Sequence, residues 1–134
     1  MSVNKIYVIS QGFYGNRTGV EIDREEVDRF ILGYVDSSTP VNEEQFDRTI
    51  VHIPNADNIV IVYNKHQEDE VRKKQRELWE TERREPKPLA FISEGEENDI
   101  EIYSRCIVCR VNEDGEFESL RDGDDKRFMR YLAQ

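Results

Sequence analysis

Short runs of β-branched and aromatic residues, separated by polar turns, dominate the hydrophobic pattern of this chain. Lys5–Ser10 and residues 18–22 predict two strands joined by a glycine-rich loop. Thr49–Ile53 and Asn58–Tyr63 predict a second pair, and the linking Pro54–Asp57 has residue types that favour a turn. The last of these strands is apolar at consecutive positions, which predicts burial on both faces.

The C-terminal half repeats the strand pattern. Leu89–Ser93 predicts a strand, and Asp99–Asn112 predicts either one long strand or a bent pair. Asn112–Gly115 predicts a hairpin turn in which Gly115 takes a positive φ, and Glu116–Leu120 is the returning strand.

A short amphipathic helix is predicted after the first two strands. Asp23 is a suitable N-cap, and Glu26 completes a variant of the capping box. The apolar positions that follow recur at i, i+3, i+4 and i+7, which is one helix face; they are Val27, Phe30, Ile31 and Tyr34. Asn42–Asp47 predicts a second short helix, because Pro40 and acidic residues suit a helix start.

The most strongly charged helix is predicted over Gln67–Glu85. Acidic residues occupy its first turn and arginines its last, as the helix dipole favours. Val71, Leu78 and Trp79 form only a narrow apolar seam, so we expect a largely solvated, projecting helix that contacts another subunit. Glu68 and Arg72 have the spacing of a favourable i,i+4 ion pair.

A last short helix is predicted from Asp124, with Phe128, Tyr131 and Leu132 on one face. The elements together predict a single α+β domain over residues 1–134. We expect a mainly antiparallel sheet with one capped amphipathic helix, one long charged helix and a short C-terminal helix.

The net charge of the chain and its distribution limit the kinds of binding partner that we expect. The net charge is −10, which disfavours duplex nucleic acid as a partner, because binding to it needs many cations. Of the 19 lysines and arginines, five precede residue 65 and the other 14 fall between Lys65 and Arg130, so the C-terminal half has cations for a compact anion. We expect no membrane segment and no secretory signal, since no apolar run is long enough, and we expect a cytoplasmic protein.

The glycines of "QGFYGNRTG" do not form a known phosphate-binding motif. Gly12, Gly15 and Gly19 have neither the spacing nor the following helix of a dinucleotide fingerprint, and no Gly-Lys-Ser/Thr follows them. We therefore expect a loop that links two strands, with glycines required for backbone geometry.

The residues that usually carry catalysis or hold metals are sparse. Cys106 and Cys109 lie three apart in a β-rich run, where they point to opposite faces and suit a buried core. His52 is expected to be a half-buried strand residue and His66 a helix-start residue, and neither belongs to a recognisable triad. We expect no metal site, no cofactor and no enzymatic activity.

Arginines near aromatic residues form the candidate binding set. Phe91 and Tyr103 could stack on a base, and Asn98 could add amide hydrogen bonds. Four arginines could bind phosphates bidentately, and they are Arg105, Arg110, Arg121 and Arg127. The alternative is that these arginines pair with acidic residues between Glu113 and Asp125.

Four stretches of the chain resemble a known family: "NKIYVISQGFYGN", "GVEIDREEVDRFI", "NIVIVYNK" and "EIYSRCIVCRVNEDGEFESL". Together they resemble the first described type of phage anti-Thoeris sponge proteins. The resemblance implies a non-enzymatic protein that binds cyclic ADP-ribose isomers in the host bacterial cytoplasm and withholds them from the immune effector. It also implies a homo-oligomer, a dimer or a hexamer, with nucleotide pockets between protomers, and separate sites for cyclic oligonucleotides in some members.

A second class of function fits the net charge. An acidic protein can inhibit a host protein by presenting Asp and Glu side chains as a mimic of DNA. The concentration of cations after residue 64 opposes this alternative. The two classes differ in ligand, since a mimic binds a basic protein and a sponge binds a small nucleotide.

Overall fold

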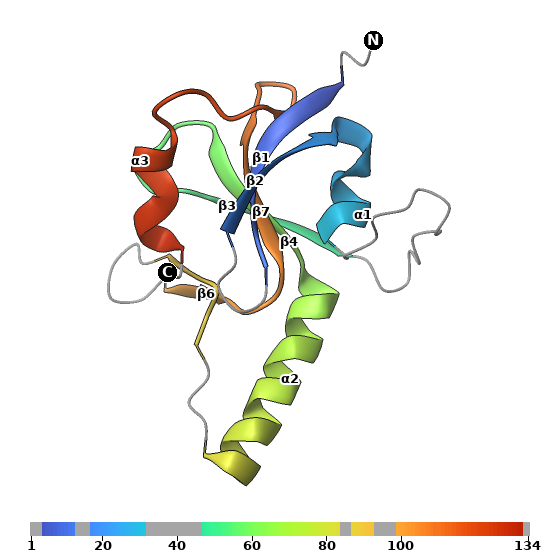
Figure 1. The fold of residues 1–134 in the computed structure, drawn as a ribbon, viewed down its shortest axis with the longest axis vertical. Coiled ribbons are helices and arrows are strands. Elements are labelled where there is room, and N and C mark those ends of the chain that lie inside the picture. The colour runs from blue at the N-terminus through green and yellow to red at the C-terminus, as the bar shows by residue number, and fades with distance from the viewer. Residues whose placement is uncertain (1–3, 13–16, 32–46, 84–86, 93–98, 133–134) are drawn as a thin grey trace.

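An antiparallel sheet forms the centre of the computed structural model, which describes residues 4–12, 17–31, 47–83, 87–92 and 99–132 (Figure 1). The fold is α+β, as the sequence predicts. Its strands are β1 (Lys5–Gln11), β2 (Arg17–Asp23), β3 (Arg48–His52), β4 (Ile59–Asn64), β5 (Ala90–Ile92), β6 (Ile100–Ile102), β7 (Cys106–Val111) and β8 (Phe117–Glu118). Its helices are η2 (Arg24–Glu26), α1 (Val27–Ile31), α2 (Lys65–Glu82), α3 (Asp125–Phe128) and η4 (Met129–Tyr131), of which η2 and η4 are 3-10 helices.

The main sheet has six strands in the order β2-β1-β7-β4-β3, with β8 paired to β7. Strands β4 and β7 lie inside the sheet, and Val60 to Val62 are fully buried, which confirms the predicted strand covered on both faces. Because side chains alternate along a strand, the two faces belong to separate cores. Ile61 and Val108 pack under α3 on one face, and Val60 and Ile107 pack with α1 on the other.

The segment predicted as one long strand or a bent pair is a bent pair. Strand β6 pairs with β5 in a separate two-stranded sheet, and β7 belongs to the main sheet. The backbone leaves strand geometry over residues 103–105. The expected alternation of side chains therefore applies only within β7, where Cys106 and Cys109 do enter opposite cores.

The turns follow the residue types that predict them. Asn55 and Asn58 have φ of 61° and 68° in the β3–β4 connection, a conformation that asparagine tolerates. Gly115 has φ of 81° in the β7–β8 turn, as predicted. Gly19, in contrast, has no left-handed φ, and a Cβ there would collide with the end of the Tyr7 side chain, which would have to shift.

The first helical segment begins as η2 and continues as α1. Asp23 ends β2 and makes no side-chain capping hydrogen bond, so the predicted capping box is wrong. Val27 and Ile31 are buried as the stripe predicts, and Phe30 packs against the same core. The predicted helix over 42–47 and the stripe residue Tyr34 lie outside the described residues, apart from Asp47.

Helix α2 starts two residues before its predicted beginning. Asn64 caps it, since its side-chain oxygen accepts hydrogen bonds from the amides of His66, at 3.2 Å, and Asp47, at 2.8 Å. Beyond its first turns the helix extends away from the sheet (Figure 1), as predicted. It ends at Arg83, which has a left-handed φ of 57°.

The C-terminal helical segment is shorter than a regular helix but occupies the predicted place. Phe128 is buried against the main sheet, and Leu132 forms an isolated antiparallel bridge with Ala90. This bridge brings η4 alongside β5. None of the helices in the part of the chain that the structure describes is long and apolar enough to cross a lipid bilayer.

Candidate ligand-binding surface

The outer face of the two-stranded sheet presents two of the predicted ligand residues. Ala90, Ile92 and Ile102 point into the core, so the residues between them point outward. Phe91 is opposite Glu101 in register and is 41% exposed. Tyr103 follows β6, and its hydroxyl donates a hydrogen bond to Glu101 at 2.5 Å.

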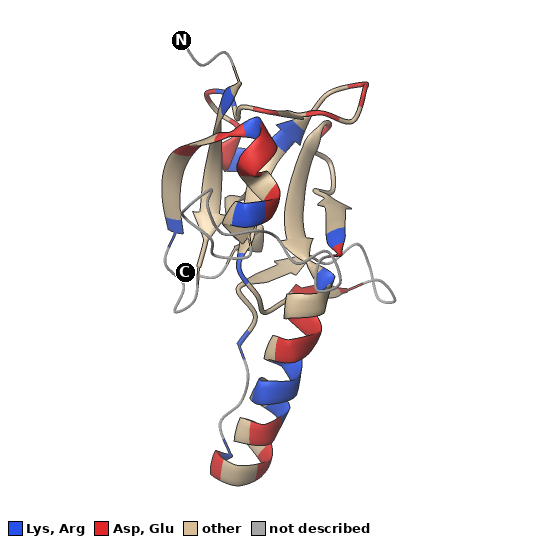
Figure 2. Ribbon diagram, turned by 90° about the vertical axis from the view of Figure 1, so that its right-hand side faces the viewer, with Lys and Arg blue, Asp and Glu red and all other residues tan. Residues whose placement is uncertain are grey.

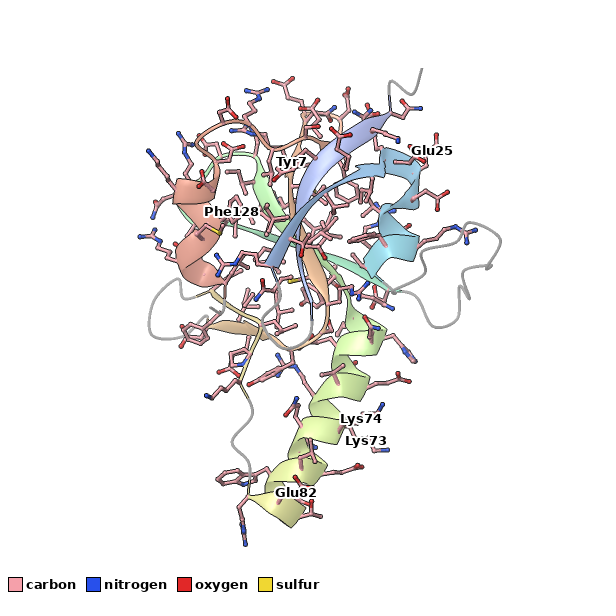
Figure 3. The ribbon with its side chains drawn as sticks, viewed as in Figure 1. Tyr7, Glu25, Lys73, Lys74, Glu82 and Phe128 are labelled. Carbon is pink, nitrogen blue, oxygen red and sulfur yellow. The ribbon has the colours of Figure 1, made fainter. Side chains whose placement is uncertain are left out.

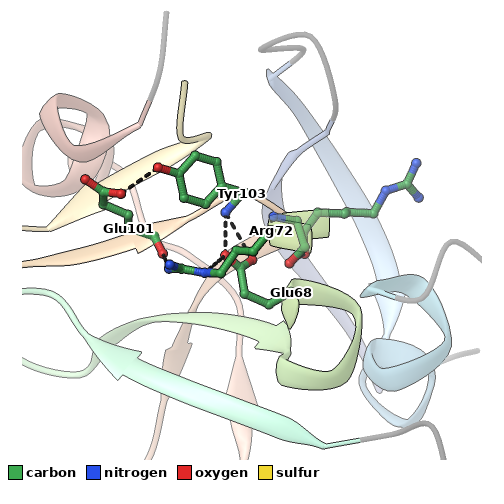
Figure 4. A network of polar contacts seen from close by, with 6 residues as sticks. Glu68, Arg72, Glu101 and Tyr103 are labelled. Carbon is green, nitrogen blue, oxygen red and sulfur yellow. Dashed lines mark hydrogen bonds and ion pairs between the residues drawn. The ribbon is translucent and has the colours of Figure 1, made fainter. Parts of the chain in front are cut away.

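A buried carboxylate holds this surface in place. Glu68, in the first turn of α2, is only 3% exposed and accepts hydrogen bonds from the amides of Tyr103 and Ser104, both at 2.8 Å (Figure 4). Arg72 donates to the same carboxylate at 3.0 Å, and it also donates to the Glu101 carbonyl. The predicted Glu68–Arg72 pair is therefore real, and it also joins α2 to the corner between β6 and β7.

Two contacts hold the side chain of Tyr103, one from Arg72 and one from Glu101. The guanidinium of Arg72 lies 5.1 Å from the centre of its ring, within the range of a cation–π interaction. Burial, together with the hydrogen bond to Glu101 and the negative charge there, raises the pKa of Tyr103 to about 12. Tyr103 therefore stays neutral at physiological pH and serves as a fixed aromatic surface.

Three of the predicted arginines gather near α3. Arg110 donates from Nε and Nη2 to both carboxylate oxygens of Asp124, at 2.7 and 2.8 Å. Asp124 also accepts a hydrogen bond from the Arg121 amide at 2.7 Å, and the positive charge of Arg127 lies near it. Arg110 therefore pairs with a neighbouring acidic residue, which is the alternative to phosphate binding. Arg121 and Arg127 remain exposed.

The ion pair between Arg110 and Asp124 shifts the pKa of each group in the direction that favours its charged form. Hydrogen bonds from Arg110, and then from the Arg121 amide, lower the pKa of Asp124 despite its burial. The same carboxylate raises the pKa of Arg110. The pair fixes the turn before α3 to strand β7.

Arg105 lies apart from the other candidates. Its guanidinium is 6.0 Å from the ring centre of Phe30 in α1, on the face of the main sheet opposite to α3. Arg110 and Phe128 belong to the α3 face, so Arg105 and Arg110 do not line one pocket within a single chain. Asn98, the remaining predicted residue, lies outside the described residues.

A hollow of about 240 Å³ brings together two arginines that sequence analysis did not select. It lies between η2, α1 and the β7–β8 turn. Arg48 pairs with both oxygens of Asp28 at 2.9 Å, and its guanidinium lies 5.2 Å from the ring centre of Phe117. Arg24 approaches Glu116 at 3.7 Å. No sequence signal identified this hollow, because its walls come from segments far apart in the chain.

The cysteines and the histidines lie in positions that do not suggest catalysis. Burial raises the pKa of both thiols, Cys106 and Cys109, to about 12, which keeps them protonated. His52 is exposed on β3, so the prediction of a half-buried residue is wrong, and His66 is a helix-start residue as predicted. Within the described ranges, no three His, Cys, Asp or Glu side chains are grouped as metal ligands.

No model of a known protein family matches the chain, and no curated protein or solved structure matches it either. The family resemblance of the four sequence stretches therefore remains a prediction.

Proposed function

We propose that this protein binds and sequesters a small cyclic nucleotide of the cyclic ADP-ribose class without converting it. The observation that best supports the proposal is the outer face of the β5–β6 sheet. There an exposed Phe91 lies on the same face as Tyr103, which is itself covered by the Arg72 guanidinium. Such aromatic surfaces stack on nucleobases of any sequence.

Cations for the phosphates are available close to this surface. The Ala90–Leu132 bridge places η4 next to β5, and Arg130 is exposed there, with its guanidinium 4.9 Å from the centre of the Tyr131 ring. Guanidinium groups form charge-assisted, bidentate hydrogen bonds with phosphate oxygens. Arg127 on α3 is a further exposed cation in this region.

The rigidity of the surface favours sequestration. Glu68 fixes the backbone of Tyr103 by accepting its amide hydrogen, so little ordering is required when a ligand binds. Phe91 on this face is exposed to solvent in the described part of the chain. A second copy of the chain would cover it, in agreement with the pockets between protomers that the family resemblance implies.

The test measures capture and release of the ligand. The protein is mixed with individual cyclic ADP-ribose isomers, free ligand is separated, and the bound fraction is then released by heat and identified by mass spectrometry. We expect depletion of one isomer before heating and recovery of the same isomer, chemically unchanged, afterwards. Absence of depletion overturns the proposal, and recovery of a converted product overturns the claim that the ligand is only held.

A matched pair of variants locates the site. Phe91→Ala should abolish capture of the ligand. Tyr7→Ala is the control and should still capture it, because Tyr7 on β1 is as exposed as Phe91, at 42% against 41%. Full capture by Phe91→Ala would show that the site is elsewhere. If the protein instead captures a basic host protein, and added salt weakens that complex steeply, the acidic mimic is the better explanation.

A further inference from the structure

The outer half of α2 exposes the largest apolar side chains of the helix. Leu78 is 36% exposed and Trp79 is 44% exposed, and every residue from Arg76 to Glu82 is exposed. Of the 18 residues of α2, only Glu68 is buried. Among the described residues, this half of the helix therefore receives little stabilisation from packing within its own chain.

Without a partner, the outer part of α2 lacks the main source of helix stability in proteins. Isolated helices shorter than about 12–15 residues are marginal, and most helical stability in proteins comes from packing of an apolar face. The segment from Arg76 to Glu82 includes Trp79, a residue type enriched at the centre of protein contacts, and the exposed apolar Leu78 beside it. The partner must cover these two side chains.

The charges along α2 are arranged in bands (Figure 2). A basic segment, which we call the basic band, includes Arg72, Lys73, Lys74 and Arg76. The acidic band that follows it includes Glu77, Glu80 and Glu82. Asp69 and Glu70 precede the basic band, and Arg83 follows the acidic one. Lys73 and Lys74 extend away from the helix (Figure 3). The boundary between the bands lies next to Leu78.

We infer that α2 pairs with α2 of a second copy of this chain in antiparallel orientation, centred near Leu78 and Trp79. An antiparallel pair places the basic band of each copy alongside the acidic band of the other. A parallel pair would place like charges together, which destabilises neighbouring helices. Two α2 helices paired without a stagger are thus complementary in charge when they are antiparallel, and Leu78 and Trp79 lie within that contact.

The pairing gives the expected homo-oligomer a specific surface. It deepens the proposed function, because a sponge with pockets between protomers needs self-association. Its test uses ligand-free protein, however, so failure to capture a nucleotide and failure to pair are separate results.

Sedimentation velocity over a series from micromolar to near-millimolar concentration tests the association. We expect a monomer–dimer equilibrium in the wild-type protein, and Leu78→Glu should remain monomeric at all concentrations. Trp79 is the sole tryptophan of the chain, so its emission should shift to shorter wavelength as dimer forms. A wild-type protein that is monomeric throughout the series overturns the inference, as does a Leu78→Glu variant that still associates.

A charge exchange tests the orientation. Variant one is Lys73→Glu with Lys74→Glu, and variant two is Glu80→Lys with Glu82→Lys. Variant one leaves the basic band with no net charge, and variant two makes both bands positive, so each should be monomeric alone. An equimolar mixture should form a heterodimer. A control, Lys5→Glu with Lys126→Glu, makes the same change in net charge as variant one at exposed positions outside α2 and should dimerise like wild type.

Two results would overturn the antiparallel orientation. One is a mixture of the two variants that stays monomeric while circular dichroism shows that each variant is folded. The other is a variant that dimerises on its own as strongly as the control.

Discussion

The carboxylate of Asp124 accepts two parallel hydrogen bonds from Arg110, at 2.7 and 2.8 Å, with side-chain exposures of only 5% and 13%. This contact connects the C-terminal helical segment to the central strand β7. It also changes the interpretation of Arg110, which sequence analysis had selected for phosphate binding.

Asp124→Ala should lower the free energy of unfolding by roughly 3–5 kcal/mol, the usual cost of removing one partner from a buried ion pair. Arg110 would lose both of its acceptors, and the Arg121 amide would lose its partner. Urea denaturation measures the difference. Asp122→Ala, which removes an exposed carboxylate from the same turn, is the control and should change stability little.

The contribution of Asp124 should also depend on pH. Its pKa is lowered in the folded protein, so its stabilising effect is complete above the unfolded value of about 3.9. The effect is lost as pH falls through the lower, folded value, where the carboxylate accepts a proton. The stability difference between wild type and Asp124→Asn should therefore be constant at neutral pH and shrink below about pH 4. A difference that grows on acidification would contradict this assignment.

Glu68→Gln should destabilise the protein although it preserves size. The amide nitrogen of glutamine cannot accept the hydrogen bonds that Tyr103 and Ser104 donate, so a buried donor loses its partner at a cost of roughly 1–3 kcal/mol. Asp69→Asn, an exposed neighbour on the same helix, should have almost no effect. Equal thermal stability of the two variants would show that the Glu68 network is not important for stability.

Both cysteines should be unreactive in the folded protein. The thiols of Cys106 and Cys109 are buried in opposite cores, and burial raises the pKa of each to about 12. A thiol-specific chromogenic reagent should react with neither at neutral pH, and with both after denaturation in guanidinium chloride. Rapid reaction in native buffer would contradict the placement of β7 inside the sheet.

Local patterns in the sequence were sufficient to predict much of the fold. The consecutive apolar residues of β4 identified an internal strand, and the turn residues around Asn55 and Gly115 identified two hairpins. The spacing of Val27 and Ile31 identified the helical face that packs on the sheet. These features depend on neighbours within a few residues, which is why sequence patterns could show them.

The parts that sequence analysis missed depend on contacts between distant segments. Glu68 has the pattern of a solvated ion pair, and only the approach of Tyr103, 35 residues later, buries it. Strand alternation puts Arg105 on the same face as Ile107 and Cys109, but its contact with Phe30 depends on α1 packing over that face. Arg24 and Arg48 meet around one hollow for the same reason.

The position of Glu68 has a consequence for local opening motions. Because its carboxylate joins the first turn of α2 to the amides of Tyr103 and Ser104, these two regions form one cooperative unit and open together. In native-state hydrogen exchange, the amides of Tyr103 and Ser104 should exchange at the same rate as those in the early turns of α2. The amides of residues 76–82 should exchange much faster in the monomer and slow down with increasing protein concentration.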